Sequence, residues 1–315
     1  MKSLLTKNTA SLVLTMSVVL ATNLANAEPQ YSTTALSAYS GTVENSMERE
    51  IPLGDAVIQR SIISVEGRKG VAHHHIQLTP PSPKYHHVIF VGGKGDLKCD
   101  PGSEEATKGM GMGINFVLRT RLDYAANGGN VVMFCAPSDR WGEKTNRNWL
   151  TGRGKNNDYR VSSEFEEDFR LLAAYLKQQH DLPIVVNGTS SGARAAAWLA
   201  MKTPELVDLL IMSAPAVKGH EWEPVNFLEG GAETINQPTL VLVNKSDRCD
   251  KTPPKHAKQF HDMIASESKS FVEFDSNKKH PGKFGEACKP LSQHGFYGLE
   301  TQSVSTTVAF IEDNL

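Results

Sequence analysis

Short apolar segments alternate with helix-like segments along most of the chain, and no other feature limits the fold as strongly. Six apolar segments indicate buried strands, at 88–91, 131–134, 184–186, 209–212, 240–243 and 271–274. Helix-like patterns lie at 114–125, from Ser162 onward, and at 193–201, 254–266 and 303–313. Strands that alternate with helices form right-handed βαβ units. The sequence therefore predicts an α/β fold, with a mostly parallel sheet that helices cover on both faces.

The first third of the chain departs from this alternation. Residues 58–65 and 71–78 predict an antiparallel hairpin at the edge of the sheet, because two β-rich segments flank a Gly-containing turn. Residues 28–57 are polar and aperiodic, which predicts an extended lead-in to a domain that spans 58–315. Farther along, the interval 214–238 is longer than a simple crossover needs. We interpret it as a candidate for a small cap over the site.

Residues 1–27 have the pattern of a secretory signal. Lys2 and Lys7 supply the positive start, and the apolar run at 12–21 is too short to span a bilayer. The small residues Ala25 and Ala27 then predict cleavage before Glu28. The alternative is an uncleaved membrane anchor. We expect a periplasmic or extracellular protein that does not associate with the membrane after signal removal.

Charge and cysteine content narrow the possible partners. The formal net charge is −2, and removal of the two signal lysines makes it −4, with no basic run to attract nucleic acid. An even number of cysteines in an exported chain predicts two disulfides, and three pairings are possible. The spacing excludes a C-x-x-C zinc pattern. The four residues are Cys99, Cys135, Cys249 and Cys288.

A G-x-S-x-G pattern at 188–192 provides the candidate nucleophile, Ser190. It follows a predicted strand directly and precedes a predicted helix, which is the setting of a nucleophile elbow. Glycines on both sides let the strand and the helix approach closely. The backbone N–H of Ser191 would then point from a helix N-terminus toward a developing oxyanion. The alternative role for Ser190 is that of a helix N-cap.

A serine nucleophile needs a base, and the base needs an orienting acid. The loop after 240–243 carries Asp247 and Asp250, and the loop after 271–274 carries His280 and His294. Asp247 is closer to the anchoring strand, so it is the better candidate for the acid. His280 follows two lysines, which would disfavour an imidazolium there, so His294 is the better candidate for the base. Each of these residues has a simpler alternative role on the surface.

The glycine-rich loop after residue 91 predicts the second oxyanion donor, at Gly93 or Lys94. The loop contains neither G-K-[ST] nor G-x-G-x-x-G, so it does not predict phosphate binding, and we predict no cofactor. The histidines at 73–75 and 86–87 are candidate metal ligands by residue type. Neighbouring residues of a strand point to opposite faces, so three adjacent histidines cannot act as ligands together. We therefore predict no metal site.

Several of these motifs occur together in a known family. The glycines at 92, 93 and 95, the segments 115–121 and 136–139, the serine motif, the segment 247–249 and the segment 294–296 resemble those of bacterial α/β-hydrolases, broadly similar to dienelactone-hydrolase-type esterases. The resemblance covers about residues 58–315. It implies the α/β-hydrolase fold and a triad of Ser190, Asp247 and His294.

In this sheet the strands before Cys99 and Cys135 are neighbours, and so are the strands before Cys249 and Cys288. We therefore predict the pairs Cys99–Cys135 and Cys249–Cys288, the second of which would brace the loops of the acid and the base. The predicted function is hydrolysis of a small-molecule ester, thioester or amide through an acyl-enzyme. The alternatives are a serine peptidase or amidase, and a non-catalytic binding protein on a hydrolase scaffold.

Overall fold

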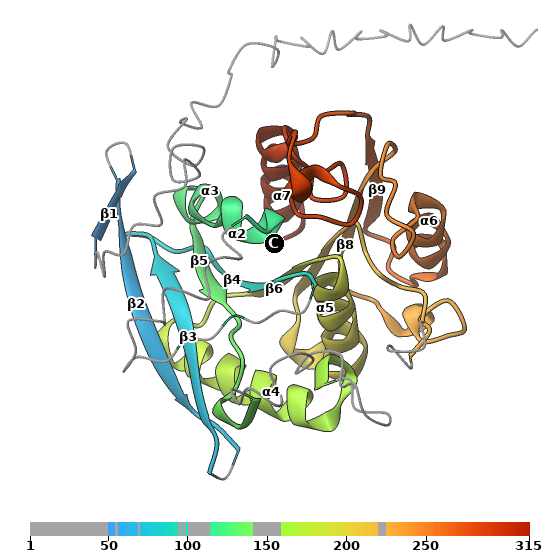
Figure 1. Ribbon diagram of the computed structural model, residues 1–315. Helices are drawn as coiled ribbons and strands as arrows, with labels where there is room; N and C mark the ends of the chain where they lie inside the picture. The colour runs from blue at the N-terminus through green and yellow to red at the C-terminus, as the bar shows by residue number, and fades with distance from the viewer. Residues whose placement is uncertain are drawn as a thin grey trace, which may run out of the picture. The chain divides into compact units, whose positions relative to one another are not determined.

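A nine-stranded sheet runs through the described part of the chain, in the order β1-β2-β3-β5-β4-β6-β7-β8-β9 (Figure 1). The strands from β4 onward are parallel to one another, whereas β1, β2 and β3 form an antiparallel edge, and β3 is also antiparallel to β5. The strands are β1 (Glu50–Leu53), β2 (Ala56–Glu66), β3 (Ala72–Thr79), β4 (Tyr85–Phe90), β5 (Gly129–Met133), β6 (Ile184–Thr189), β7 (Leu209–Ser213), β8 (Thr239–Asn244) and β9 (Lys269–Phe274).

The structure is a computed structural model that describes residues 50–53, 56–68, 70–93, 97, 99, 114–140, 159–219 and 225–315. The predicted signal peptide, residues 28–49 of the predicted lead-in, and Lys94 lie outside the described residues. Among the described residues, no helix has both the length and the apolar character that crossing a bilayer requires.

Helices cover both faces of the sheet, as the alternation of segments predicts. The helices are α2 (Phe116–Arg119), α3 (Arg121–Ala126), α4 (Ser163–Gln179), α5 (Ser191–Lys202), α6 (Pro254–Met263) and α7 (Glu300–Asn314). One core contains residues of α4, α5 and α6, and the other contains residues of α2, α3 and α7. Within β6, Ile184 and Val186 belong to the first core and Val185 to the second. The strands β4 to β8 are buried along their whole length and are rich in apolar residues because both of their faces are covered, whereas β9 at the edge is only partly buried.

The helix predicted at 114–125 is divided in the structure. α2 ends at Arg119 and α3 begins at Arg121, and Thr120 is the cap residue of both. The Thr120 hydroxyl donates a hydrogen bond to the carbonyl of Phe116 at 3.0 Å. A threonine that bonds back in this way competes with the helical backbone and bends the helix.

The first strand lies inside the predicted lead-in. β1 pairs with β2 in the register Ile51↔Ile58, so part of the segment 28–57 belongs to the sheet. β1 has four residues and contains Pro52, and proline is tolerated on an edge strand because one side of that strand has no partner. A strand this short, with a proline in it, has too little alternation of apolar and polar residues to be predicted from the sequence.

The interval 214–238 does not form the expected cap in its described part. Phe227 is buried against the rings of Trp198 and Phe260, beside α5 and α6. Ala216 is the described residue of this interval that lines the site cavity. Residues 220–224 lie outside the described residues.

Candidate functional site

Ser190 lies at the sharp turn between β6 and α5, with a φ of 55° and a ψ of −121°. A positive φ is unusual for a residue other than glycine, and such strain is common at functional sites. A Cβ atom on Gly188 would lie 2.2 Å from the carbonyl oxygen of Gly192, and one on Gly192 would lie 2.1 Å from that of Phe90. Both glycines of the motif are therefore required by close backbone approaches, and these approaches hold the turn in its strained form.

The candidate acid and base meet above the carboxyl ends of β8 and β9. Nδ1 of His294 lies 3.0 Å from Oδ2 of Asp247, and the exposed fractions of the two side chains are 8% and 3%. The other carboxylate oxygen of Asp247 accepts a hydrogen bond from the backbone N–H of Cys249 at 2.8 Å. Because Nδ1 faces the carboxylate, the other imidazole nitrogen, Nε2, is the one that could accept a proton from a nucleophile.

The structure brings Asp247 and His294 together, but not the alternatives Asp250 and His280. The carboxylate of Asp250 is exposed and lies 3.5 Å from Sγ of Cys288. Nδ1 of His280 instead accepts a hydrogen bond from the N–H of Gly282 in its own loop, at 3.1 Å. Of the two candidate acids and two candidate bases, Asp247 and His294 are therefore the two that are in contact.

Thr252 is a member of the site that sequence reasoning missed. Its hydroxyl donates to Oδ2 of Asp247 at 3.2 Å, and its oxygen lies 2.9 Å from Nδ1 of His294. The side chain thus contacts both partners and is itself buried. Only the fold of the loop between β8 and α6 brings this threonine to the pair, so no sequence motif marks it.

Arg119 is a second missed residue, and it fixes the loop that carries His294. Its guanidinium donates to the carbonyl of Pro290 at 2.9 Å and to that of Gly295 at 2.7 Å. It also forms an ion pair with Glu300 at the start of α7, at 2.7 Å. The buried arginine therefore holds both sides of His294 in place. Its place in the segment 115–121, which the family resemblance includes, was the available signal.

Two of the three predicted oxyanion donors, Ser191 and Gly93, are among the described residues. Ser191 is the first residue of α5, and Gly93, with a φ of +63°, follows β4 on the neighbouring side. Both line the same cavity as Ser190 and His294. Lys94 lies outside the described residues.

Gly92 marks where the loop after β4 approaches the candidate nucleophile. A Cβ atom on Gly92 would lie 3.1 Å from Cβ of Ser190 and 3.3 Å from Nδ2 of Asn115. The amide of Asn115 and the side chain of Ser190 thus flank the same point, and Asn115 lines the cavity too. Sequence reasoning did not identify Asn115 as a site residue.

The cavity that contains these groups has a volume of about 860 Å³. Its wall combines the predicted site residues with apolar side chains such as Ile114 and Phe116 and with charged side chains of the loops after β8 and β9. A mostly apolar hollow with a few converging polar groups is typical of a small-molecule site.

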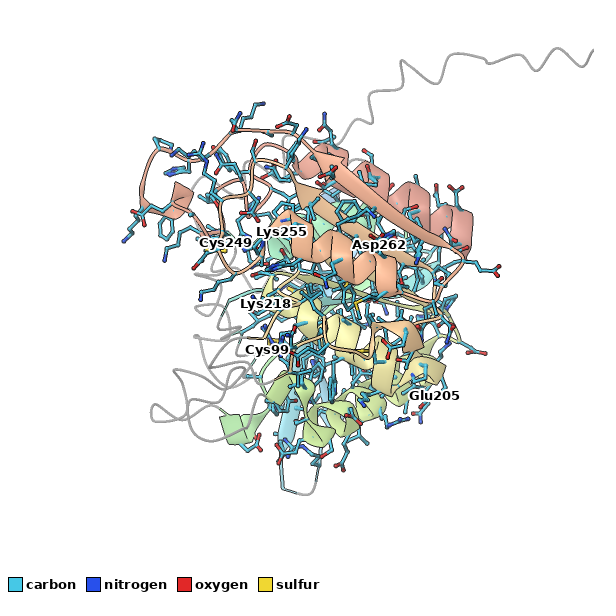
Figure 2. The ribbon with its side chains drawn as sticks, turned by 90° about the vertical axis from the view of Figure 1, so that its right-hand side faces the viewer. Cys99, Glu205, Lys218, Cys249, Lys255 and Asp262 are labelled. Atoms are coloured by element: carbon cyan, nitrogen blue, oxygen red, sulfur yellow. A yellow bond between two sulfur atoms is a disulfide. The ribbon has the colours of Figure 1, made fainter. Side chains whose placement is uncertain are left out.

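Both predicted disulfides are present in the structure. Cys99 pairs with Cys135, and Cys249 pairs with Cys288, with Cα–Cα distances of 5.9 Å and 4.6 Å. In Figure 2 the labelled Cys99 and Cys249 lie toward the same side of the molecule, away from Glu205, which follows α5. The second disulfide joins the loop of Asp247 to the loop of His294. It also lines the cavity.

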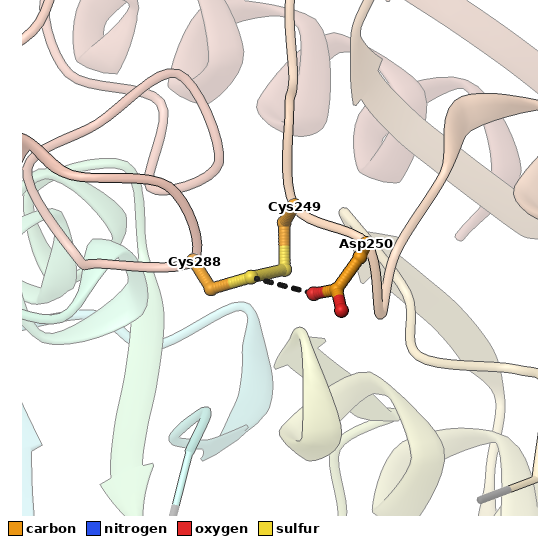
Figure 3. A group of neighbouring side chains, drawn as sticks. All are labelled: Cys249, Asp250 and Cys288. Atoms are coloured by element: carbon orange, nitrogen blue, oxygen red, sulfur yellow. Dashed lines mark hydrogen bonds between the residues drawn. A yellow bond between two sulfur atoms is a disulfide. The ribbon is translucent and has the colours of Figure 1, made fainter.

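Two groups of side chains have the composition of a metal site, but each has another explanation. Cys249, Cys288 and Asp250 lie close together (Figure 3), yet both sulfurs belong to a disulfide and are not thiolate ligands. In β3, Nε2 of His73 donates to the carbonyl of Cys135 at 2.9 Å, whereas Nδ1 of His75 accepts from the N–H of the same residue at 3.3 Å. Burial lowers the pKa of both of these histidines.

Several solved hydrolase structures are similar to this chain. An esterase from Pyrococcus furiosus has a TM-score of 0.54 at 11% identity, covering 81% of this chain and 93% of that one. A predicted CIB-like hydrolase from Thermoplasma acidophilum has a TM-score of 0.53 at 17% identity, with coverage of 81% and 99%. A cold-adapted esterase from an Arctic intertidal metagenomic library has a TM-score of 0.53 at 10% identity, with coverage of 84% and 97%.

These similarities show that the chain has the α/β-hydrolase fold, as predicted. At such low identities they concern the fold alone. No protein-family model matches the sequence, and no curated protein matches it either.

Proposed function

We propose that this chain is an exported serine hydrolase that cleaves an ester-type bond through an acyl-enzyme. The observation that carries the proposal is the buried contact between Asp247 and His294, because His294 lines the same cavity as Ser190. A carboxylate, an imidazole and a strained serine in this arrangement are the parts of a nucleophilic triad. The esterase neighbours support hydrolysis of an ester at the level of the fold.

The first half of the proposed reaction forms the acyl-enzyme. Oγ of Ser190 attacks the carbonyl carbon of the ester, and its proton moves to Nε2 of His294. Asp247 keeps the imidazole oriented through Nδ1 and stabilises the imidazolium. Backbone N–H groups, among them that of Ser191 at the start of α5, stabilise the oxyanion. The tetrahedral intermediate then collapses, and the alcohol leaves with the proton from His294.

Water completes the cycle in the second half. It attacks the acyl-enzyme carbonyl while His294 again accepts a proton, and the carboxylic acid leaves as the proton returns to Oγ of Ser190. The chain's own residues supply every proton transfer in this scheme. The proposal therefore requires no cofactor.

A fluorophosphonate probe tests this proposal directly, because it reacts with an activated serine. The wild-type protein should be labelled, and peptide mapping should find the label on Ser190. Ser190→Ala should abolish both the labelling and nearly all ester turnover, a loss of several orders of magnitude, while the fold remains intact by circular dichroism. Absence of labelling together with absence of turnover on a panel of p-nitrophenyl esters and peptide amides would indicate a non-catalytic scaffold. Turnover of the amides in preference to the esters would indicate a peptidase or amidase.

Export is the second part of the proposal. The predicted signal at 1–27 and the two disulfides support it, because disulfides persist in oxidising compartments. Protein recovered from the periplasm or the medium should begin at Glu28 by mass spectrometry. Peptide mapping without reduction should link Cys99 to Cys135 and Cys249 to Cys288. An intact N-terminus in the membrane fraction would instead show an anchor.

A further inference from the structure

Lysines outnumber acidic residues among the described residues that line the cavity. Lys251 lies in the loop after β8, and Lys283 and Lys289 lie in the loop after β9. Among the described residues that line the cavity, Glu286 is the acidic counterpart to these three lysines. The whole chain has a formal net charge of −2, so the excess of lysines here does not reflect the composition of the protein.

No ion pair among the described residues neutralises the ammonium groups of these lysines. Within the described part of the chain, neither Lys251 nor Lys289 forms a salt bridge. Nζ of Lys283 lies over the ring of Phe284, 5.3 Å from its centroid, and the ring does not cancel its charge. Asp250 is a nearby acid, but its carboxylate lies beside the disulfide, 3.5 Å from Sγ of Cys288. The three ammonium groups can therefore interact with a negatively charged ligand.

The lysines stand beside apolar surface and not within a polar groove. Phe284 is 42% exposed, which is unusual for so large an apolar side chain, and it lines the cavity together with Ile114, Phe116 and Pro290. Lysine presents a compact charge on a flexible stem. Low-dielectric walls strengthen the field that such charges create in a cleft. A ligand that suits this surface has an apolar body and a negative charge.

We propose that the substrate is an ester that carries an anionic group on an apolar skeleton, and that Lys251, Lys283 and Lys289 bind the anionic group while Ser190 attacks the ester carbonyl. This inference rests on the proposed function. The three lysines select among substrates and take no part in bond making, because the proton transfers belong to Ser190 and His294.

The test compares esters that differ only in charge. For the alcohol side of the ester, the pair is 4-carboxyphenyl and 4-carbamoylphenyl butanoate. For the acyl side, the pair is the p-nitrophenyl half-ester of adipic acid and the p-nitrophenyl ester of its monoamide. We expect kcat/KM for the carboxylate to exceed that for the matching amide by about tenfold in at least one pair at low salt. That pair identifies the side of the ester that bears the charge.

Two further measurements assign the preference to the lysines. Raising NaCl to about 0.5 M should reduce the ratio in the wild-type protein, because salt screens exposed charges. The triple variant Lys251→Gln, Lys283→Gln, Lys289→Gln should bring the ratio close to one. The matched control is Lys84→Gln. Lys84 is an exposed lysine that pairs with Glu312 and precedes β4, at the opposite end of that strand from the site, and its variant should keep the wild-type ratio.

The possible failures can be told apart. If the neutral esters are hydrolysed but both ratios are near or below one, the inference on the substrate is wrong and the proposed function stands. A preference for the carboxylate that survives in the triple variant would also overturn the role of the lysines. If no ester is hydrolysed and no probe labels Ser190, the proposed function fails and the substrate inference fails with it.

Discussion

His87 in the sheet and His294 in the loop before α7 are both buried, yet their surroundings suit opposite roles. The ring of His87 in β4 lies 3.0 Å from the side-chain amide of Asn187 and packs against Tyr124, with 4.3 Å between ring centroids. Burial lowers its pKa to about 3. His294 instead has the carboxylate of Asp247 at Nδ1 and a cavity beside it.

The difference shows that burial alone does not make a histidine a candidate base; the groups around the ring decide it. In the sheet, the low dielectric disfavours the imidazolium, and the ring serves as a neutral hydrogen-bonding spacer between strands. In the loop, the carboxylate would compensate the positive charge that the proposed reaction places on the imidazole. The predictions below test this comparison by removing one contact at a time.

The largest effect should come from His294. We expect His294→Ala to lower kcat by at least about a hundredfold, because the proposed reaction loses its general base. Steady-state kinetics on the ester that the wild type hydrolyses best would measure this. The matched control, His280→Ala, should stay within about threefold of wild type, since His280 is bonded within its own loop. A larger loss in the control than in His294→Ala would assign the base to His280.

The carboxylate of the pair should be nearly as important. Asp247→Asn keeps the shape of the side chain but removes the charge that orients and compensates the imidazole, so kcat should fall by at least about a hundredfold. Asp250→Asn should change kcat by no more than about threefold, because that carboxylate is exposed beside the disulfide. Equal losses in the two variants would show that the choice between the two acids was wrong.

His87 provides the opposite test, on stability. Between pH 6.5 and pH 3 the unfolded chain protonates this histidine and the folded chain does not, so the ring destabilises the fold progressively as the pH falls. Lowering the pH from 6.5 to 4 should therefore reduce the free energy of unfolding less in His87→Gln than in the wild type. The difference between the two reductions should be roughly 3 kcal/mol. Urea titrations at the two pH values would measure it. Exposed His180→Gln is the control, and kcat of His87→Gln should stay near wild type.

The regular parts of this fold could be predicted from the sequence because their signals are local. The strands β4 to β8 are buried on both faces, which leaves an apolar run such as the one in β6. The turn around Ser190 is set by the close backbone approaches of Gly188 and Gly192, and both glycines are visible in the sequence. β1 was not predicted, since a four-residue edge strand with a proline carries little pattern.

The site could be predicted only in part. The serine motif and the order of the loops identify Ser190, Asp247 and His294 as candidates. Thr252, Arg119 and Asn115 could not be identified in this way, because only the folding of distant segments onto one another brings each of them to the site. Their contacts join segments that are distant in sequence, such as Arg119 and Gly295, and no periodicity or motif reports such contacts.

The smallest effect should come from Thr252, whose hydroxyl contacts both Asp247 and His294. Thr252→Val keeps the shape of the side chain and removes the hydroxyl, so Asp247 and His294 lose a shared positioning group, and kcat should fall by about tenfold. Thr252→Ser should restore most of the activity, which a merely structural role would not predict. Thr306→Val, which removes a hydroxyl that is exposed and bonded to the backbone of α7, is the control. An unchanged kcat in Thr252→Val would show that the carboxylate alone positions the base.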